Sequence, residues 1–107
     1  MRRFKQWFVR NFKCDPPAEL MGYLKDHPDG SSGSSGSLYG VEDIMAYTEE
    51  RELEQKGVLY IGTGELLSVF LLRASDGKVF LVDENDLQAV DATFKDLEVC
   101  MNLLHIE

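Results

Sequence analysis

The hydrophobic pattern of the chain changes its period at Gly57, and this change limits the possible folds more than any other feature. Before Gly57, apolar residues recur at the spacing of amphipathic helices. After it come three short apolar runs rich in β-branched and aromatic residues, at 58–61, 69–72 and 78–82. With 107 residues, of which 44% are apolar, the chain can form one core, so we expect a single domain over residues 1–107.

Turns that contain glycine separate the three runs. Residues 62–64 (Gly-Thr-Gly) follow the first run, and residues 75–77 (Ser-Asp-Gly) lie between the second and the third. An Asp-Gly pair between two apolar runs is a strong hairpin signal, because these residues tolerate positive φ. The last two runs are apolar on both faces, so we expect them in the middle of the sheet, covered on each side.

Helices are expected on both sides of these strands in the sequence. The first covers residues 3–13. The second starts at an Asp15 N-cap followed by two prolines, and it ends before Pro28 because the residue before a proline avoids the helical region. The third begins at Val41 and ends at Gly57, a good helix terminator.

The last segment has the pattern of a helix that Thr93 caps, with Asp96 three residues later. Its apolar stripe consists of Phe94, Leu97, Met101 and Leu104. The predicted order is therefore helix, helix, loop, helix, three strands, helix. This order predicts an α+β fold with a small, mostly antiparallel sheet and helices packed against it.

Residues 29–37 have the composition of a flexible linker. The sequence Asp-Gly-Ser-Ser-Gly-Ser-Ser-Gly-Ser has no apolar side chain and no periodicity. Its Gly-Ser-Ser repeat looks like a cloning linker, so a natural loop and an engineered loop replacement both stay open. We expect a flexible loop here, followed by a short strand at residues 38–39.

The first helix has two possible roles. Its aromatic residues recur at helical spacing, and basic residues occupy most of the other positions. Either this aromatic stripe packs on the core, or it docks on a membrane surface or a scaffold protein. We favour the core, since a basic helix is also stabilised beside an acidic body. The aromatic residues of the stripe are Phe4, Trp7, Phe8 and Phe12.

Charge is unevenly distributed along the chain. Residues 1–13 hold five of the eleven basic residues and no acidic one, so the rest of the chain carries six basic and 19 acidic residues, a net charge of −13. Such a body repels phosphate backbones, and we expect no binding to nucleic acid. It attracts basic proteins and speeds encounter with them.

Nothing in the sequence indicates export or a membrane span, and we expect no stable membrane insertion. No run approaches the roughly 18 apolar residues of a spanning helix, and the basic N-terminus lacks the apolar stretch of a signal peptide. Cys14 and Cys100 lack metal-site spacing and lie in segments with a helical pattern. We therefore expect reduced, packed thiols in a cytoplasmic protein.

The sequence offers little for catalysis. The histidines are His27 and His105, and neither lies in a motif with a nucleophile and an oxyanion-binding group. Residues 83–86 lack the alternating ligands, central glycine and distal glutamate of a calcium loop. We expect a protein that is not an enzyme and that uses no metal or other cofactor.

The densest acidic cluster at a strand end lies in residues 83–86. It is either a polar turn that leaves the sheet or a patch that binds a partner. Turn carboxylates on a hairpin are pre-positioned and lose little entropy on binding. The pair Leu66 and Leu67 is either an exposed apolar anchor or buried. The residues that we expect to bind a partner are Asp83, Glu84, Asp86, Glu65 and Asp91.

Several motifs resemble those of SUKH domains, a group named for yeast cell-wall regulators and their bacterial relatives. Residues 16–24 (PPAELMGYL) resemble the proline-led helix near the start of these domains, and residues 38–44 (LYGVEDI) resemble their short strand and following helix. Residues 61–64 (IGTG) and 76–83 (DGKVFLVD) are similar to the central hairpin, and residues 92–97 (ATFKDL) to the closing helix. The resemblance lies in the order and spacing of these motifs.

The resemblance implies a mode of action and no catalytic residues. Bacterial members of this group are mostly immunity proteins, which bind and neutralise a cognate toxin, often a nuclease, inside the producing cell or its siblings. The resemblance therefore implies a domain whose acidic turns cover the basic surface of a toxin. Eukaryotic relatives imply the alternative, a general interaction or regulatory module that docks on a scaffold or membrane through its first helix.

Overall fold

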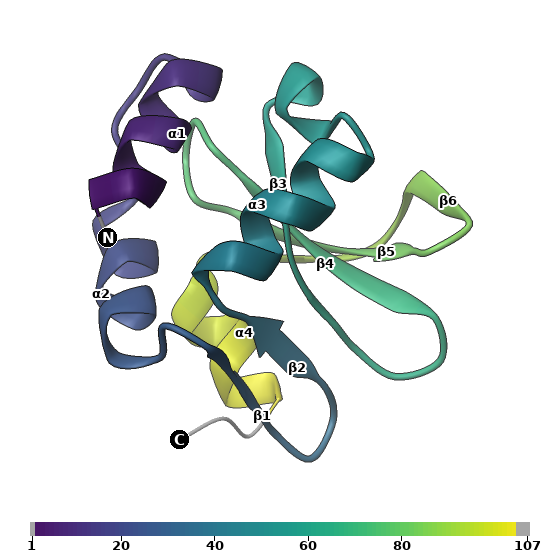
Figure 1. The fold of residues 1–107 in the computed structure, drawn as a ribbon. Coiled ribbons are helices and arrows are strands. Elements are labelled where there is room, and N and C mark those ends of the chain that lie inside the picture. The colour runs from purple at the N-terminus through teal and green to yellow at the C-terminus, as the bar shows by residue number, and fades with distance from the viewer. Residues whose placement is uncertain (1, 105–107) are drawn as a thin grey trace.

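Four helices pack against a six-stranded antiparallel sheet in residues 2–104, the part of the chain that the computed structural model describes (Figure 1). The helices are α1 (Arg2–Phe12), α2 (Ala18–Asp26), α3 (Val41–Glu50) and α4 (Leu97–Leu103), and a 3-10 helix η1 (Leu53–Lys56) follows α3. The strands are β1 (Gly30–Ser32), β2 (Ser37–Tyr39), β3 (Val58–Thr63), β4 (Ser68–Arg73), β5 (Val79–Asp83) and β6 (Asp86–Phe94). The predicted α+β class is confirmed.

The sheet is a meander, in which each strand pairs with the next one along the chain, in the order β1-β2-β3-β4-β5-β6. The three runs expected as strands are β3, β4 and β5. Residues 69–72 of β4 are all buried, as expected of a central strand. Phe80 and Leu81 of β5 are only half-buried, so this strand is less fully covered than its apolar sequence suggests.

Alternate residues of β4 face two separate apolar clusters, because successive side chains of a strand point to opposite faces of the sheet. Phe70 and Leu72 belong to the larger cluster, which also contains buried residues from all four helices. Val69 and Leu71 belong to a smaller cluster on the other face. Its remaining buried members are Leu53, Tyr60 and Val82.

The aromatic stripe of α1 packs on the larger cluster. Phe4, Trp7 and Phe8 are buried, and the ring of Phe12 lies 4.6 Å from that of Phe8. The basic residues of this helix are exposed. This arrangement confirms that the aromatic stripe packs on the core. Docking these rings on a membrane would require α1 to leave the core. No helix in residues 2–104 has the length and hydrophobicity needed to cross a bilayer.

The start of α2 differs from the prediction. Pro17 is its N-cap, with ψ 136°, and no side chain caps the helix, so the predicted Asp15 cap is wrong. A residue that precedes a proline favours the extended conformation. Asp15 and Pro16 both precede prolines, so the extended conformation continues to Pro17 and keeps Asp15 out of reach of the first turn.

The third helix is shorter than predicted. It ends at Glu50, because Glu52 adopts a left-handed conformation with φ 54° and breaks the helical path before Gly57. The chain resumes as η1, whose Leu53 is buried in the smaller cluster. If the helix continued through residue 56, its apolar residues would all lie along one face. The break instead lets Leu53 reach the face of the sheet that carries the smaller cluster.

The C-terminal helix begins later than predicted, and a strand precedes it. Residues 86–94 form β6, so Thr93 and Phe94 lie in a strand and the predicted Thr93 cap is wrong. Phe94 packs on Phe70 from the edge of the sheet, with ring centroids 6.1 Å apart. The N-cap of α4 is Asp96, whose carboxylate accepts a hydrogen bond from the backbone N–H of Val99 at 3.0 Å.

We expected a flexible loop over residues 29–37, and the structure instead has a short hairpin there. β1 pairs with β2, and β2 in turn pairs with β3. Gly36 lies so close to β3 that a Cβ atom at this position would collide with the carbonyl oxygen of Thr63. The absence of apolar periodicity hid these strands, because backbone pairing and close glycine contacts stabilise them.

Candidate functional site

Two turns of the sheet meet at one end and bring most of the predicted binding residues together. β4 and β5 are paired so that Ser68 lies opposite Asp83. One residue further on, the backbone N–H of Glu84 donates a hydrogen bond of 2.8 Å to the carbonyl oxygen of Leu67. This bond joins the β3–β4 turn to the β5–β6 turn. We call six of the exposed residues here the paired-turn surface: Glu65, Leu66, Leu67, Asp83, Glu84 and Asp86.

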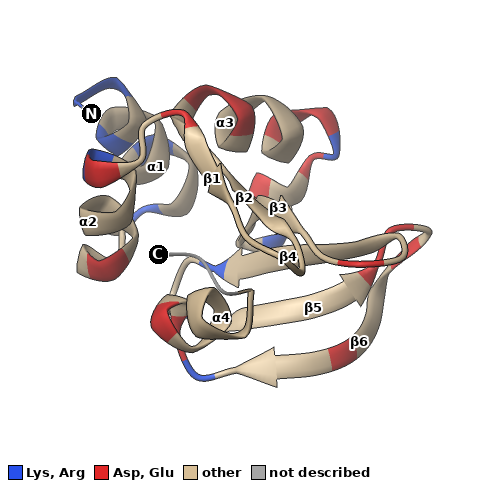
Figure 2. Cartoon of the chain, turned by 90° about the horizontal axis from the view of Figure 1, so that it is seen from below, with Lys and Arg blue, Asp and Glu red and all other residues tan. Residues whose placement is uncertain are grey.

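All the charged residues of the paired-turn surface are acidic. Its four carboxylates are exposed, and neither turn contains a lysine or an arginine (Figure 2). Asp83 accepts a hydrogen bond from the backbone N–H of Asn85 at 2.7 Å, and Asp86 accepts one from the backbone N–H of Gln88 at 3.1 Å. Each of these side chains is thus held by its own turn and still presents an oxygen to solvent.

Leu66 and Leu67 project from this acidic surface in a strained conformation. They are the central residues of the turn closed by the hydrogen bond from Ser68 N–H to the carbonyl of Glu65, and their φ angles are 50° and 58°. A left-handed backbone suits glycine or asparagine and is unfavourable for leucine. Both side chains are nevertheless in solvent, 94% and 62% exposed. Of the two alternatives, exposure is therefore correct for this pair.

Asp91 lies apart from the paired-turn surface. It is five residues beyond Asp86 on β6, at a bulge where Val90 and Ala92 pair with neighbouring residues of β5. Its side chain is exposed further along β6, so it lies outside the two turns. Four of the five predicted binding residues are therefore brought together, and one is not.

A tyrosine cluster that the sequence did not indicate lies over the smaller apolar cluster. The rings of Tyr39, Tyr47 and Tyr60 are 5.0–5.7 Å apart, and the guanidinium of Arg51 lies 4.8 Å from the centre of the Tyr60 ring. Burial raises the pKa of Tyr60 to about 12, with smaller contributions from Tyr39 and Glu84. The tyrosines come from β2, α3 and β3, so no local sequence pattern could have revealed the cluster.

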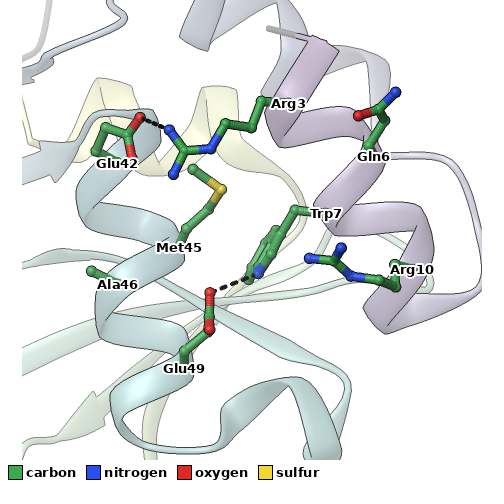
Figure 3. A pocket seen from close by; sticks show the side chains of 8 residues that line it. All are labelled: Arg3, Gln6, Trp7, Arg10, Glu42, Met45, Ala46 and Glu49. Carbon is green, nitrogen blue, oxygen red and sulfur yellow. Dashed lines mark hydrogen bonds and ion pairs between the residues drawn. The ribbon is translucent and has the colours of Figure 1, made fainter.

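A groove of about 390 Å³ lies between α1 and α3 (Figure 3). Its polar groups are largely engaged with one another. Arg3 pairs with Glu42 at 2.6 Å, and the indole N–H of Trp7 donates to Glu49 at 3.0 Å. Arg10 extends beside Trp7 (Figure 3). These contacts join two helices, and we regard the groove as part of the helix packing.

The described residues offer no assembled metal site. Within 2–104, no group of three or more His, Cys, Asp or Glu side chains is placed to hold an ion. Cys100 is buried, and this burial raises the pKa of its thiol to about 12, which opposes formation of a nucleophilic thiolate. His27 stacks on Tyr23 with ring centroids 4.9 Å apart. His105 lies outside the described residues.

Comparison of the chain with protein-family models and with curated proteins gave no match. The SUKH resemblance therefore rests on the motifs quoted above. What the structure adds is the geometry of the paired-turn surface, in which two exposed leucines lie in the turn joined to the turn of the pre-positioned carboxylates Asp83 and Asp86.

Proposed function

We propose that this protein binds another protein through the paired-turn surface, and that it is a cytoplasmic immunity protein for a toxin. Its partner is a basic toxin domain, often a nuclease in the group that the sequence resembles. Bound carboxylates would occupy the positions that nucleic-acid phosphates take in such a cleft. The protein would thus act by covering the basic surface of the toxin, without catalysing a reaction.

The observation that carries this proposal is the conformation of Leu66 and Leu67. Two consecutive leucines in the left-handed region destabilise the turn, and their exposure gains nothing from the core. Asn-Gly would suit both φ angles. Strained residues cluster at functional sites, and exposed apolar side chains on a rigid turn can enter a pocket of a partner at low entropic cost.

The surrounding carboxylates suit the rim of such an interface. Charged residues at a rim contribute more to the speed and specificity of association than to affinity. The leucines would supply the desolvated centre, where most binding energy is found in protein interfaces. The partner would therefore present an apolar pocket bordered by lysine and arginine residues.

The test is affinity capture from source cells with three versions of the tagged domain, followed by co-expression. The wild type is compared with a variant in which Asp83→Asn, Glu84→Gln and Asp86→Asn are combined. A control variant neutralises three exposed carboxylates away from the paired-turn surface, at Asp26, Asp29 and Glu98. We expect one basic protein with the wild type and the control, and little of it with the first variant.

The captured protein is then expressed alone and together with the domain. Growth arrest by the partner alone, and growth in the presence of the wild-type domain, would support the immunity function. Equal recovery of the partner by all three versions would contradict the paired-turn surface as the binding site. Recovery of a scaffold protein or of membranes that depends on the basic residues of α1 would favour the interaction-module alternative.

A further inference from the structure

The outer edge of β6 is open. β6 is the last strand in the sheet order and has nine residues, and no strand in residues 2–104 pairs with its outer side. Most of its residues are exposed. The bulges between β5 and β6 also leave residues 87–89 and Asp91 without register partners on β5. A long open edge presents backbone N–H and C=O groups that another strand can bind.

The usual protection of an edge strand is largely missing from β6. Natural edges commonly carry lysine or proline, or are very short. The other edge of this sheet, β1, has three residues. β6 contains no lysine, arginine or proline, and its charged residues are Asp86 and Asp91. Its two aspartates and its bulges are the protective devices it has, and the bulges leave residues in the middle of the strand without partners on β5.

An apolar groove runs along the inner side of this edge. It has a volume of about 230 Å³ and lies on the face of the smaller apolar cluster. Val90, which is 52% exposed, and the half-buried Leu87 form its border on β6. Phe80 and Val82 of β5 lie next to them in the groove. A strand added to β6 would direct every second side chain toward this face.

Charge identifies the occupant. Asp86 and Asp91 are exposed along the strand, and Asp86 also belongs to the paired-turn surface, so the edge continues that surface. Two cations, Lys56 and Arg73, also line the groove, but Arg73 lies over the Phe80 ring and is already paired with Asp76. A second copy of this chain, with its net charge of −8, would bring like charges together. A segment with basic residues would neutralise them.

We propose that β6 binds an extended segment of the basic partner, in which apolar and basic residues alternate, as an added strand of the sheet. The inference rests on the proposed function, because it specifies how the same partner continues beyond the paired-turn surface. Apolar side chains of the segment lie against Leu87 and Val90. Its lysine or arginine residues lie near Asp86 and Asp91, and its backbone pairs with the open edge.

The probe is a capped eight-residue peptide of alternating lysine and valine, labelled for fluorescence anisotropy. A peptide of the same sequence with every backbone nitrogen methylated keeps the charges and side chains but cannot donate backbone hydrogen bonds. We expect the first peptide to bind with Kd below about 1 mM and the methylated peptide to bind at least about tenfold more weakly. Hydrogen exchange of the amides of residues 87–91 should slow when the first peptide binds.

The protein variants test the same edge. Ala89 is exposed and has no register partner on β5, and Ala89→Pro removes a backbone N–H from this strand, with Ala89→Val as its matched control. We expect about tenfold weaker binding to the proline variant and unchanged binding to the valine variant. Circular dichroism checks that both variants fold. If the proline variant does not fold, the hydrogen-exchange measurement on the wild type still tests the inference.

Equal binding of the two peptides, or no binding at about 1 mM, would overturn the inference. So would a dimer in sedimentation equilibrium that Ala89→Pro dissociates, because the occupant would then be a second copy. These outcomes are separate from the capture experiment. If capture depends on the paired-turn surface and the methylated peptide binds as well as the unmethylated one, the proposed function stands and strand addition fails.

Discussion

Glu19 and Leu97, which are 78 positions apart, are joined by a hydrogen bond of 2.6 Å from the backbone N–H of Leu97 to the carboxylate of Glu19. The second carboxylate oxygen accepts a bond from the N–H of Glu98 at 3.2 Å. The first N–H groups of a helix lack partners within the helix. α2 therefore caps the start of α4, together with Asp96, and fixes the segment that follows β6.

Replacing Glu19 with alanine should destabilise the fold by about 1 kcal/mol, the typical cost of losing a helix cap. The reason is that two donors at the start of α4, the part-buried N–H of Leu97 and the exposed N–H of Glu98, lose a charged acceptor. Urea unfolding followed by circular dichroism measures the change. Glu98→Ala is the control, because it removes an exposed carboxylate from the same helix turn. An equal loss in both variants would contradict the capping role of Glu19.

Relieving the strain of the β3–β4 turn should stabilise the protein and weaken its binding. In the double variant Leu66→Asn and Leu67→Gly, both residues suit a positive φ. We expect the free energy of unfolding to rise by about 1–2 kcal/mol, since a left-handed residue other than glycine costs about this much. The same variant should bind the captured partner much more weakly. Urea unfolding and surface plasmon resonance measure the two effects.

The control for this variant is Leu66→Ala with Leu67→Ala, which keeps the strain and removes the large side chains. It should lose binding without any gain in stability. If partner affinity is unchanged in both double variants, the leucines are not the centre of the interface. If stability does not rise in the Asn-Gly variant, the turn holds no strain.

The carboxylates and the leucines should affect different rate constants. Neutralising Asp83, Glu84 and Asp86 with Asn, Gln and Asn should lower the association rate with the captured partner by about tenfold at low ionic strength. The amide oxygens can still accept the hydrogen bonds within the turn. Because salt screens long-range charge, the difference from wild type should shrink in about 1 M salt. A slower association that is independent of salt would contradict electrostatic steering.

The sequence predicted the parts of the fold that have a strong local signal. The Asp-Gly turn and the continuous apolar runs located β3, β4 and β5, and the aromatic spacing of Phe4, Trp7 and Phe8 located α1 and its buried face. Each of these signals arises from neighbours along the chain, so it could be recognised without any knowledge of tertiary contacts.

The remaining elements depend on contacts with distant residues. β1 contains only Gly and Ser. It forms because it pairs with β2, whose other side is paired with β3. β6 is mostly exposed, so it lacks the apolar alternation of a half-buried strand. Phe94 fits the helical spacing of Leu97 and Met101, yet it packs on Phe70 from the sheet. Such pairing partners cannot be read from local sequence.

Only part of the candidate site was predicted, because its geometry also depends on contacts between distant residues. Glu84 and its neighbours lie at an evident strand end, and the turn signals also marked Glu65. Their proximity follows from the pairing of β4 with β5, which the hairpin signal implied. The positive φ angles of Leu66 and Leu67 could not be predicted, because leucine is a poor residue for that conformation.

The ion pair in the β4–β5 turn should contribute to stability above about pH 4 and lose that contribution in acid. Hydrogen bonds from Arg73 and from the backbone N–H of Lys78 lower the pKa of Asp76 from 3.8 to about 2. A lowered pKa in the folded state means that the contribution is complete above the unfolded pKa and disappears as the pH falls through the folded pKa. Wild type should therefore be more stable than Asp76→Asn at pH 6, and the gap should narrow between pH 4 and pH 2. Urea unfolding at each pH measures the gap, and a constant gap would contradict the shift.

The two thiols should differ strongly in reactivity in the folded protein. Cys14 is half-buried, and its sulfur lies 3.8 Å from the carbonyl oxygen of Ala74, whereas Cys100 is buried with a pKa raised to about 12. Since the thiolate is the reactive species, the raised pKa keeps Cys100 in its unreactive protonated form at pH 8. A disulfide reagent such as 5,5′-dithiobis(2-nitrobenzoate) should modify one thiol quickly in the native protein and two in urea.

Cys14→Ser should abolish the fast reaction and Cys100→Ser should preserve it. Two fast thiols in the native state would mean that α4 leaves the core far more often than its capping by Glu19 implies.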